Sequence, residues 1–446
     1  MKNKLVQKAL LIGVLMLILL FALSSIESMI SERSNRRDSV QRDIAGGISS
    51  EQVIAGPILT IPIKRYRQVE TENEKGERVR KSVLREETLH FFPTRLDIRG
   101  GLDTEKRKRG IFEALLYHGD FLLSGEFELP ANAGLPVGEA VEWLEPAVVV
   151  GLADNRGLRS TPQLTFNQEA HAFEPGQPIA ILGNGVHAKV KLPIGQGGKF
   201  GFTIKLDLRG SQALRWLPVG RETQVQLRSS WPHPSFDGKI LPSSHQISQN
   251  GFTANWQTSH FASNFAQRYH SARSAEELQT EASGLSLVTP VDIYQQAERS
   301  VKYGFLFVML TFATFALFEV LKRLPIHPVQ YGLVGIALAL FFLLLLALSE
   351  HFPFGWSYLG AASASIALLG FYLSHVLRSL WRGLAFSGWL MVLYGALYGL
   401  LVSEDNALLM GSLLLFGILA AAMALTRKVD WYALGINPAY QEADSD

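Results

Sequence analysis

Residues 331–348 read YGLVGIALALFFLLLLAL, a run of eighteen residues without a charge. A helix of this length crosses a bilayer core of roughly 30 Å, because each residue adds 1.5 Å. Four similar runs share the last third of the chain, at residues 304–321, 355–373, 383–402 and 407–425. Buried helices of water-soluble domains are shorter and keep a polar face. The sequence therefore predicts a C-terminal bundle of five transmembrane helices over residues 303–426.

A further apolar run, residues 9–23, follows three lysines, Lys2, Lys4 and Lys8. A basic start and an apolar middle also fit a signal peptide, and Ala22 and Ser24 have the spacing that signal peptidases cleave. The run continues weakly to Ile26 and is longer than a usual signal-peptide core, so we favour an uncleaved N-terminal transmembrane anchor over residues 1–26. Either way, the segment that follows is sent across the membrane.

Residues 27–302 have the composition and the apolar pattern of a soluble, β-rich domain. The stretch FGFTIKLDL at residues 200–208 alternates with period two, the mark of a strand with one buried face. Further strands are predicted at residues 58–63, 89–93, 111–117, 121–129, 147–152, 186–192 and 223–229. The number and spacing of these strands predict an antiparallel sandwich, built as two packed sheets or as two subdomains. The fold class is therefore a membrane protein of the α+β type.

Three other segments of this domain carry local signals. A periodic pattern through Val40, Ile44 and Ile48 predicts a short amphipathic helix after the anchor. The charged residues 71–81 predict the loop of a β-hairpin. Residues 274–282 predict a helix that leads back toward the membrane.

Charges in the short loops predict the topology, because Lys and Arg accumulate on the cytoplasmic side. With the N-terminus inside, three basic loops also fall inside, at Lys322-Arg323, Arg378 with Arg382, and Arg427-Lys428. The outer loops, residues 349–351 and 404–405, carry no Lys or Arg. We expect six helices in the bacterial inner membrane, both termini in the cytoplasm, residues 27–302 in the periplasm and a cytoplasmic tail at 427–446.

Composition and motifs argue against an enzyme. The 446 residues carry a net charge of +2, which indicates neither nucleic acid nor a general polyanion as partner. The absence of cysteine excludes disulfides, thiolate metal sites and cysteine nucleophiles. The chain has no zinc-protease or nucleophile-elbow motif. We interpret His118 with Asp120, and His233 with Asp237, as hydrogen-bonded pairs rather than general bases. No catalytic residue, metal or cofactor is predicted.

Glu319 is the one charge inside the five C-terminal runs. Intramembrane carboxylates are often functional, so a proton site is one interpretation. Because Lys322 and Arg323 follow three and four residues later, we favour an ion pair at the helix end. The uncharged centres of the runs argue against an ion-coupled transporter.

Two segments are candidate binding sites. The first is a proline-aromatic stretch, made of Trp231, Pro232, His233, Pro234, Ser235 and Phe236. Its prolines hold the backbone extended, and it is either a rigid turn packed by its own aromatics or a recognition surface. The second is an outer loop that contains Glu350 and His351. We hypothesise that this loop docks under the large domain near Asp292, with Glu350 accepting hydrogen bonds from backbone groups or Arg; the alternative is a solvated loop.

Sequence motifs along nearly the whole chain resemble one family. They include WPHPSF at residues 231–236, LSEH at 348–351, and the spaced patterns at 251–256, 289–294, 327–331 and 430–432. On these motifs the chain resembles the CreD family of bacterial inner-membrane, cell-envelope integrity proteins. The resemblance implies envelope maintenance and tolerance of envelope stress or toxins, tied to a two-component regulatory system, and it implies no reaction.

The predicted function is thus a non-enzymatic membrane protein that binds an envelope component through its outer domain. The expected partners are the lipid bilayer and an envelope protein or cell-wall partner, without nucleic acid. The alternative is a channel or a component of a transport complex. No feature of the sequence indicates an oligomeric state.

Overall fold

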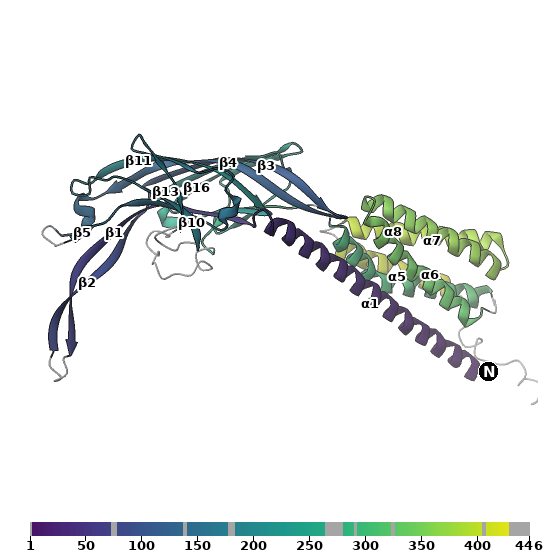
Figure 1. Cartoon of the computed structure of the whole chain (residues 1–446). Coiled ribbons are helices and arrows are strands. Elements are labelled where there is room, and N and C mark those ends of the chain that lie inside the picture. The colour runs from purple at the N-terminus through teal and green to yellow at the C-terminus, as the bar shows by residue number, and fades with distance from the viewer. Residues whose placement is uncertain are drawn as a thin grey trace, which may run out of the picture. The chain divides into compact units, whose positions relative to one another are not determined.

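The computed structural model describes residues 2–72, 78–136, 141–176, 183–263, 280–289, 292–322, 326–403 and 407–427. The chain divides into two compact units, Met1–Arg37 with Val291–Asp446, and Asp38–Pro290. The first holds the apolar helices and the second holds the strands (Figure 1). We call them the helix unit and the β-rich unit. The α+β class with one large β-rich part is confirmed.

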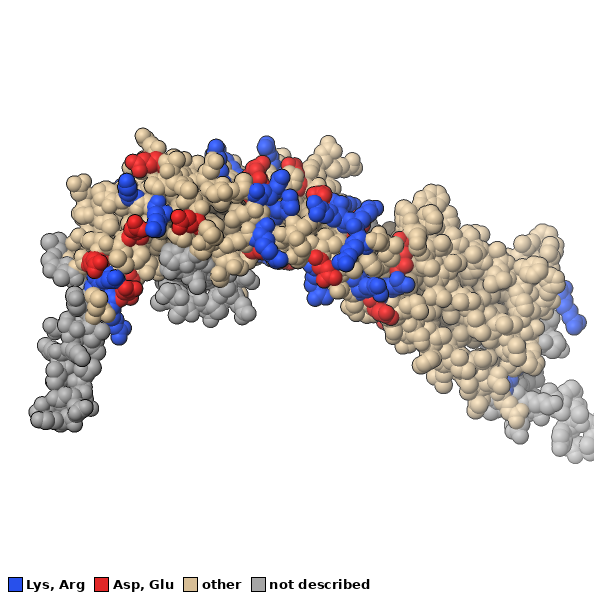
Figure 2. Space-filling view, in the orientation of Figure 1, with Lys and Arg blue, Asp and Glu red and all other residues tan. Residues whose placement is uncertain are grey.

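A helix lies at each predicted apolar run: α1 (Lys2–Gly46), α5 (Ile293–Lys322), α6 (Pro328–Ser349), α7 (Phe354–Val376), α8 (Leu380–Val402) and α9 (Ala407–Thr426). Among the described residues, four are long and apolar enough to cross a membrane, namely α1 from Leu10 onward, α6, α7 and α8. Figure 2 shows charged side chains spread over the β-rich unit, while most of the helix unit's visible surface is uncharged.

The predicted short helix after the anchor is not separate, since α1 continues without a break to Gly46. No glycine or proline interrupts residues 14–45, so nothing in that stretch stops the helix. The consecutive glycines Gly46 and Gly47 then follow, a sequence that favours termination.

Within the helix unit, α1 packs closely against α6. Leu19, Leu23 and Ile30 of α1 are buried. A Cβ added at Gly335 of α6 would lie 2.2 Å from Leu19 Cδ1, and one added at Gly332 would lie 3.5 Å from Leu15 Cδ2. Small residues at such contacts let two membrane helices approach closely. In this structure α1 is a packed member of the helix unit.

The described strands of the β-rich unit form two sheets. The nine-stranded sheet has the order β14-β17-β12-β1-β6-β10-β9, and β2 and β5 also pair with β1. Its strands are β1 (Gln52–Glu72), β2 (Arg78–Phe91), β5 (Val141–Trp143), β6 (Ala147–Leu152), β9 (Glu174–Pro175), β10 (Asn184–Lys189), β12 (Ala213–Trp216), β14 (Pro234–Gly238) and β17 (Ser283–Leu287).

The eight-stranded sheet has the order β15-β16-β13-β3-β4-β11-β7-β8. Its strands are β3 (Arg95–Arg109), β4 (Phe112–Leu129), β7 (Gln163–Phe166), β8 (Glu169–Ala172), β11 (Gly198–Ser211), β13 (Glu222–Ser229), β15 (Ser244–Ser248) and β16 (Gly251–Ser259).

Both sheets contribute to one hydrophobic core. Ile58 and Val149 come from the nine-stranded sheet, Leu123 and Ile204 come from the eight-stranded sheet, and all four are fully buried. The two-sheet alternative of the prediction is therefore the one observed. The purely antiparallel prediction is wrong, because β1 pairs with β12, and β3 with β13, in parallel. Alternation of apolar residues reports a buried face and not the direction of the neighbouring strand.

Several predicted boundaries also change. The loop predicted at residues 71–81 is shorter, since β1 reaches Glu72 and pairs it with Arg78 of β2, while residues 73–77 lie outside the described ranges. Figure 1 shows this hairpin extending beyond the rest of the sandwich. The two strands predicted within residues 111–129 form the single strand β4. The helix predicted at residues 274–282 falls mostly outside the described residues, and residues 280–282 are not helical.

Candidate functional site

The proline-aromatic stretch is more strand than turn. From Pro234 it forms β14, which pairs with β17. Just before β14, Trp231 Nε1 donates a hydrogen bond of 3.0 Å to the carbonyl of Val288. The amide of Val288 in turn donates to the carbonyl of His233 at 3.0 Å. Backbone pairing therefore fixes this segment at the edge of the nine-stranded sheet.

The two aromatics of this stretch pack inward in part. The ring of Phe236 lies 5.6 Å from that of Trp256 and 5.9 Å from that of Phe252, and both partners are buried. Trp231 is half-buried, with Lys106 Nζ 5.7 Å from its ring centroid. The side chains of His233 and Ser235, in contrast, are exposed. Recognition by this segment stays a prediction, and only its exposed residues are free to contact a partner without unpacking the core.

Neither predicted His–Asp pair forms. His118 Nε2 lies 3.5 Å from Asp103 on the neighbouring strand, rather than pairing with Asp120. Asp237 accepts two hydrogen bonds from Arg215, at 3.1 and 3.2 Å, rather than pairing with His233. Residues two apart on one strand share a face, but cross-strand neighbours lie closer. Within the described part of the chain, no group of three or more His, Asp or Glu side chains could hold a metal.

Glu350 follows α6 and has partners inside the helix unit. The hydroxyl of Tyr294 donates to Glu350 at 3.2 Å, and Arg33 Nε lies 3.8 Å from the same carboxylate. Next to them, Arg37 forms an ion pair with Asp292 at 2.5 Å. His351 is exposed, and its Nδ1 lies 3.2 Å from the carbonyl oxygen of Ala347. Arg33 is thus an ion-pair neighbour of Glu350, whereas the predicted hydrogen bonds from an arginine and docking of this loop onto the large domain stay predictions.

Glu319 pairs with the N-terminal helix. Its carboxylate accepts a hydrogen bond from Lys8 Nζ and another, of 2.9 Å, from the hydroxyl of Tyr331. Lys8 also donates to the carbonyl of Ile326 at 2.7 Å. We expected Lys322 or Arg323 as the partner. The side chain of Lys322 and all of Arg323 lie outside the described residues, and the observed partner comes from 311 positions away.

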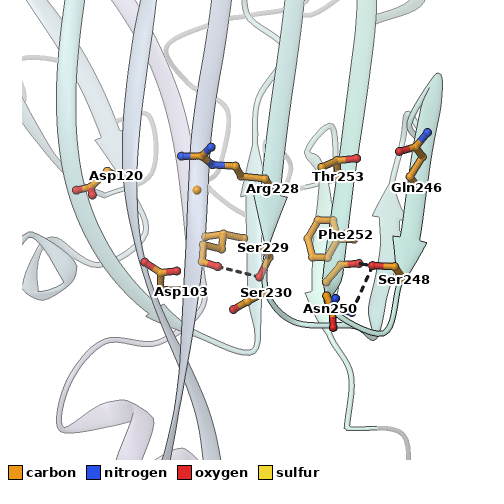
Figure 3. A pocket seen from close by; sticks show the side chains of 13 residues that line it. Asp103, Asp120, Arg228, Ser229, Ser230, Gln246, Ser248, Asn250, Phe252 and Thr253 are labelled. Carbon is orange, nitrogen blue, oxygen red and sulfur yellow. Dashed lines mark hydrogen bonds between the residues drawn. The ribbon is translucent and has the colours of Figure 1, made fainter.

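Sequence reasoning missed a hollow on the outer face of the eight-stranded sheet, with a volume of about 620 Å³ (Figure 3). Asp103, Asp120, Arg228, Gln246, Asn250 and Thr253 line it. In the sheet, Thr253 is opposite Arg228, Arg228 is opposite Gly101, and Gly101 is opposite Asp120. These four positions form one row across β16, β13, β3 and β4, in which only Gly101 has no side chain.

Because Gly101 has no side chain, the surface is recessed at the centre of this row. A Cβ placed there would meet the Arg228 side chain first, with Nε at 3.4 Å, so the guanidinium arm lies beside the empty position. Figure 3 shows Arg228 extending toward β3 from one side, with Asp103 and Asp120 beyond it. Within the described residues, neither Arg228 nor Asp120 forms an ion pair, and both are exposed.

Two further hollows, of about 410 and 470 Å³, adjoin the first and share Asp120 with it. The former adds Arg99, Gln226 and Asn255, and the latter adds Gln163, Lys205 and Asp207. We call the three hollows together the cross-strand trough. No local sequence motif indicates this trough, because each strand contributes at most three polar residues and only the strand register brings them together.

Comparison with known proteins decides the family. The family model described as "Inner membrane protein CreD" matches residues 4–432. The inner membrane protein CreD of Escherichia coli (strain K12) is 35% identical over 423 residues, covering 94% of this chain and 92% of that relative. The chain belongs to the CreD family. The family resemblance seen in the sequence is thereby confirmed.

The CreD motifs occur in both units, and one of them has a clear structural task. His327 and Gln330, from the motif at residues 327–331, cap the first turn of α6: the His327 ring accepts from the amide of Val329 at 3.3 Å, and Gln330 accepts from the amide of His327 at 3.1 Å. Such reciprocal caps satisfy helix-end donors. The CreD motif at residues 430–432 lies outside the described ranges.

Two solved structures are similar to this chain only at a low level. An M1 zinc metallopeptidase from Deinococcus radiodurans is 9% identical with a TM-score of 0.19, over 37% of this chain and 38% of that chain. Native yeast LTA4 hydrolase is 9% identical with a TM-score of 0.19, over 50% and 35%. Likeness at this level supports neither a shared fold nor a shared activity for this CreD-family chain.

Proposed function

We propose that this chain is a non-enzymatic inner-membrane protein that supports the integrity of the cell envelope and tolerance of envelope stress. In this proposal α1 and α5–α9 all cross the membrane, both termini are cytoplasmic, and the β-rich unit lies in the periplasm. The CreD family supports the membrane assignment. The distribution of basic loops supports the orientation.

The periplasmic domain is the binding part in this proposal. The observation that carries it is the cross-strand trough: an open row of polar and charged side chains, in which Arg228 and Asp120 form no ion pair among the described residues, on a two-sheet domain with its own core. A rigid scaffold that displays uncommitted hydrogen-bonding groups is suited to binding. The alternative, a channel or transport component, has less support, because two buried polar contacts join α7 to α8: Tyr358 bonds to the Tyr394 carbonyl at 2.7 Å, and Ser365 lies 2.8 Å from the Tyr394 hydroxyl.

Cysteine labelling tests the orientation, since the natural chain has no cysteine. Single variants Gln196→Cys in the β-rich unit and Ser403→Cys after α8 should react with a membrane-impermeant maleimide when the periplasm is opened. Arg378→Cys after α7 and Arg427→Cys after α9 should react only after the membrane is lysed. Labelling of Arg378→Cys or Arg427→Cys before lysis would refute the six-helix topology.

Complementation tests the role. A strain that lacks this protein should become sensitive to detergents and wall-directed antibiotics, and the full chain should restore its tolerance. Unchanged tolerance after removal, across several unrelated envelope stresses, would contradict the proposed role. Protein level in the membrane is measured alongside, so that failed complementation is not confused with failed expression.

A further inference from the structure

We infer that the cross-strand trough binds a linear glycan rich in hydroxyl and amide groups. The inference deepens the proposed function and rests on its placement of the β-rich unit outside the cytoplasm.

The shape suits a polymer rather than a small enclosed ligand. The three hollows adjoin through Asp120 and run across the strands from Gln246 on β15 to Gln163 on β7. Sites for small molecules are mostly enclosed and apolar. Here the floor is an open sheet face on which polar and charged side chains stand beside apolar ones such as the exposed Leu122, so a chain lying across the strands can contact residues of several strands in succession.

The charges in the trough are mixed. Arg99, Lys205 and Arg228 are basic, and Asp103, Asp120 and Asp207 are acidic. This balance disfavours polyanions, which require an excess of cations. Carboxylates accept hydrogen bonds from hydroxyl and amide groups, whereas guanidinium and amide side chains donate to carbonyl and hydroxyl oxygens. A sugar polymer with amide substituents offers both kinds of group along its whole length.

A peptide is disfavoured by the backbone beneath the trough. Extended peptides are commonly recognised by adding a strand to a free sheet edge. The trough's central strands β16, β13, β3, β4 and β11 each have a partner on both sides, and β15 and β8 are the edges. A peptide lying across these central strands finds no unpaired strand edge and would rely on side-chain contacts there; among the described strands of the trough only β15, at its end, has a free edge.

Arg228 and Asp120 are the residues that carry the inference. They flank the empty Gly101 position in one cross-strand row, and both are exposed. Because neither side chain supports the core, Arg228→Ala and Asp120→Ala should leave the fold intact. Lys199→Ala is the matched control: Lys199 is an exposed cation on β11 of the same sheet and lines none of the three hollows.

The experiment titrates full-length protein in detergent with an N-acetylglucosamine hexamer, and in separate arms with a hexapeptide of alternating Lys and Glu and with heparin. The wild-type chain and Lys199→Ala should bind the hexamer equally. Each trough variant should bind it about tenfold more weakly, as expected for one lost charge-assisted hydrogen bond. Co-sedimentation with purified cell-wall glycan strands should give the same ranking.

Three outcomes would overturn the inference: no binding of either glycan by the wild-type chain, equal binding by the double variant R228A/D120A, or binding of the hexapeptide or heparin alone. The far-ultraviolet circular dichroism and thermal unfolding of each variant show whether it is folded, and Arg228→Lys is used if Arg228→Ala unfolds. Failure of the glycan site leaves the cysteine-labelling pattern and complementation by the wild-type chain unchanged. Failure of the proposed function would appear in those two measurements.

Discussion

Charged side chains such as Glu319 are paired in the helix unit, whereas two charged side chains on the outer face of the β-rich unit are exposed and form no ion pair among the described residues. In the helix unit Glu319 is bonded to Lys8 and Tyr331, and Asp292 is paired with Arg37. In the cross-strand trough Arg228 and Asp120 are exposed, and neither has an ion-pair partner among the described residues. Water solvates the trough charges at no cost, whereas a charge removed from water must be compensated. The paired charges of the helix unit stabilise its fold, and the exposed charges of the trough are available to a ligand.

Glycine is used differently in the two regions as well. At Gly335 of α6 an added Cβ would collide with Leu19 at 2.2 Å, so the contact between α1 and α6 depends on the missing side chain. At Gly101 an added Cβ would make only an ordinary 3.4 Å contact with Arg228. In the helix unit the glycine permits packing, and in the trough it leaves open space.

The largest expected effect is loss of one partner from the Lys8–Glu319 pair. Lys8→Met should destabilise the helix unit by about 3 kcal/mol, because Glu319 then loses its cation. Thermal unfolding in detergent measures this effect. The double variant Lys8→Met with Glu319→Met should recover much of the loss, since no uncompensated charge remains. If Lys8→Met is as stable as the wild-type chain, the paired charges of the helix unit contribute no more to stability than the exposed charges of the trough.

Gly335→Leu should cost about 2 to 3 kcal/mol by forcing α1 away from α6. A disulfide between Leu15→Cys and Gly332→Cys, introduced into the cysteine-free chain, reports the same contact and should form only without the Gly335→Leu change. Gly395→Leu is the matched control, because no atom lies within 4 Å of a Cβ at that position of α8. Equal crosslinking in both backgrounds would show that the glycine is not required.

Phe236→Ala should destabilise the β-rich unit by about 2 kcal/mol, because a half-buried ring is removed from the Trp256 and Phe252 cluster. His233→Ala, three residues earlier and exposed, should leave stability unchanged. Urea unfolding, followed by tryptophan fluorescence, measures both. If His233→Ala abolishes stress tolerance at a normal protein level, the segment recognises a partner as well as packing.

Asp154 is a paired charge in the β-rich unit and should show a pH effect. Hydrogen bonds and ion pairing from Arg156 hold the pKa of the Asp154 carboxyl below its usual range. A carboxyl with a lowered folded-state pKa contributes stability above its unfolded-state value, near pH 4, and loses it as pH falls through the folded-state pKa. Asp154→Ala should cost about 1 kcal/mol at pH 7 and less near pH 2. A cost independent of pH would contradict this account.

The smallest expected effect is that of Arg228→Ala on stability, within about 0.5 kcal/mol. The guanidinium is exposed and has no ion pair in the described residues, so its removal should change ligand binding and not folding. Chemical unfolding midpoints of Arg228→Ala and Lys199→Ala should coincide. A large loss of stability in Arg228→Ala would show that Arg228 stabilises the fold, as the paired charges of the helix unit do.

Local patterns predicted the apolar helices and the family, but they predicted only seven of the seventeen described strands, namely β1, β2, β4, β6, β10, β11 and β13. The uncharged run at residues 331–348 predicts its helix because length and hydrophobicity are local properties, and the alternation at residues 200–208 predicts β11 for the same reason. It did not predict β3, because charged residues at 103–109 obscure the alternation at that strand's buried positions Leu96, Ile98 and Leu102. For the segment around Trp231 and Phe236 the sequence left a packed turn and a recognition surface open, and it did not show that Pro234 begins a strand.

Contacts between residues far apart in the chain depend on the tertiary structure. Lys8 and Glu319 are 311 positions apart, and the row Arg228–Gly101–Asp120 joins three strands through parallel and antiparallel register. A one-residue shift in either register would turn the row's side chains to the other face. Register depends on how whole faces pack against the shared core, which periodicity along a single strand does not specify. The apolar pattern therefore fixed the elements, and packing between them created the ion pair and the trough.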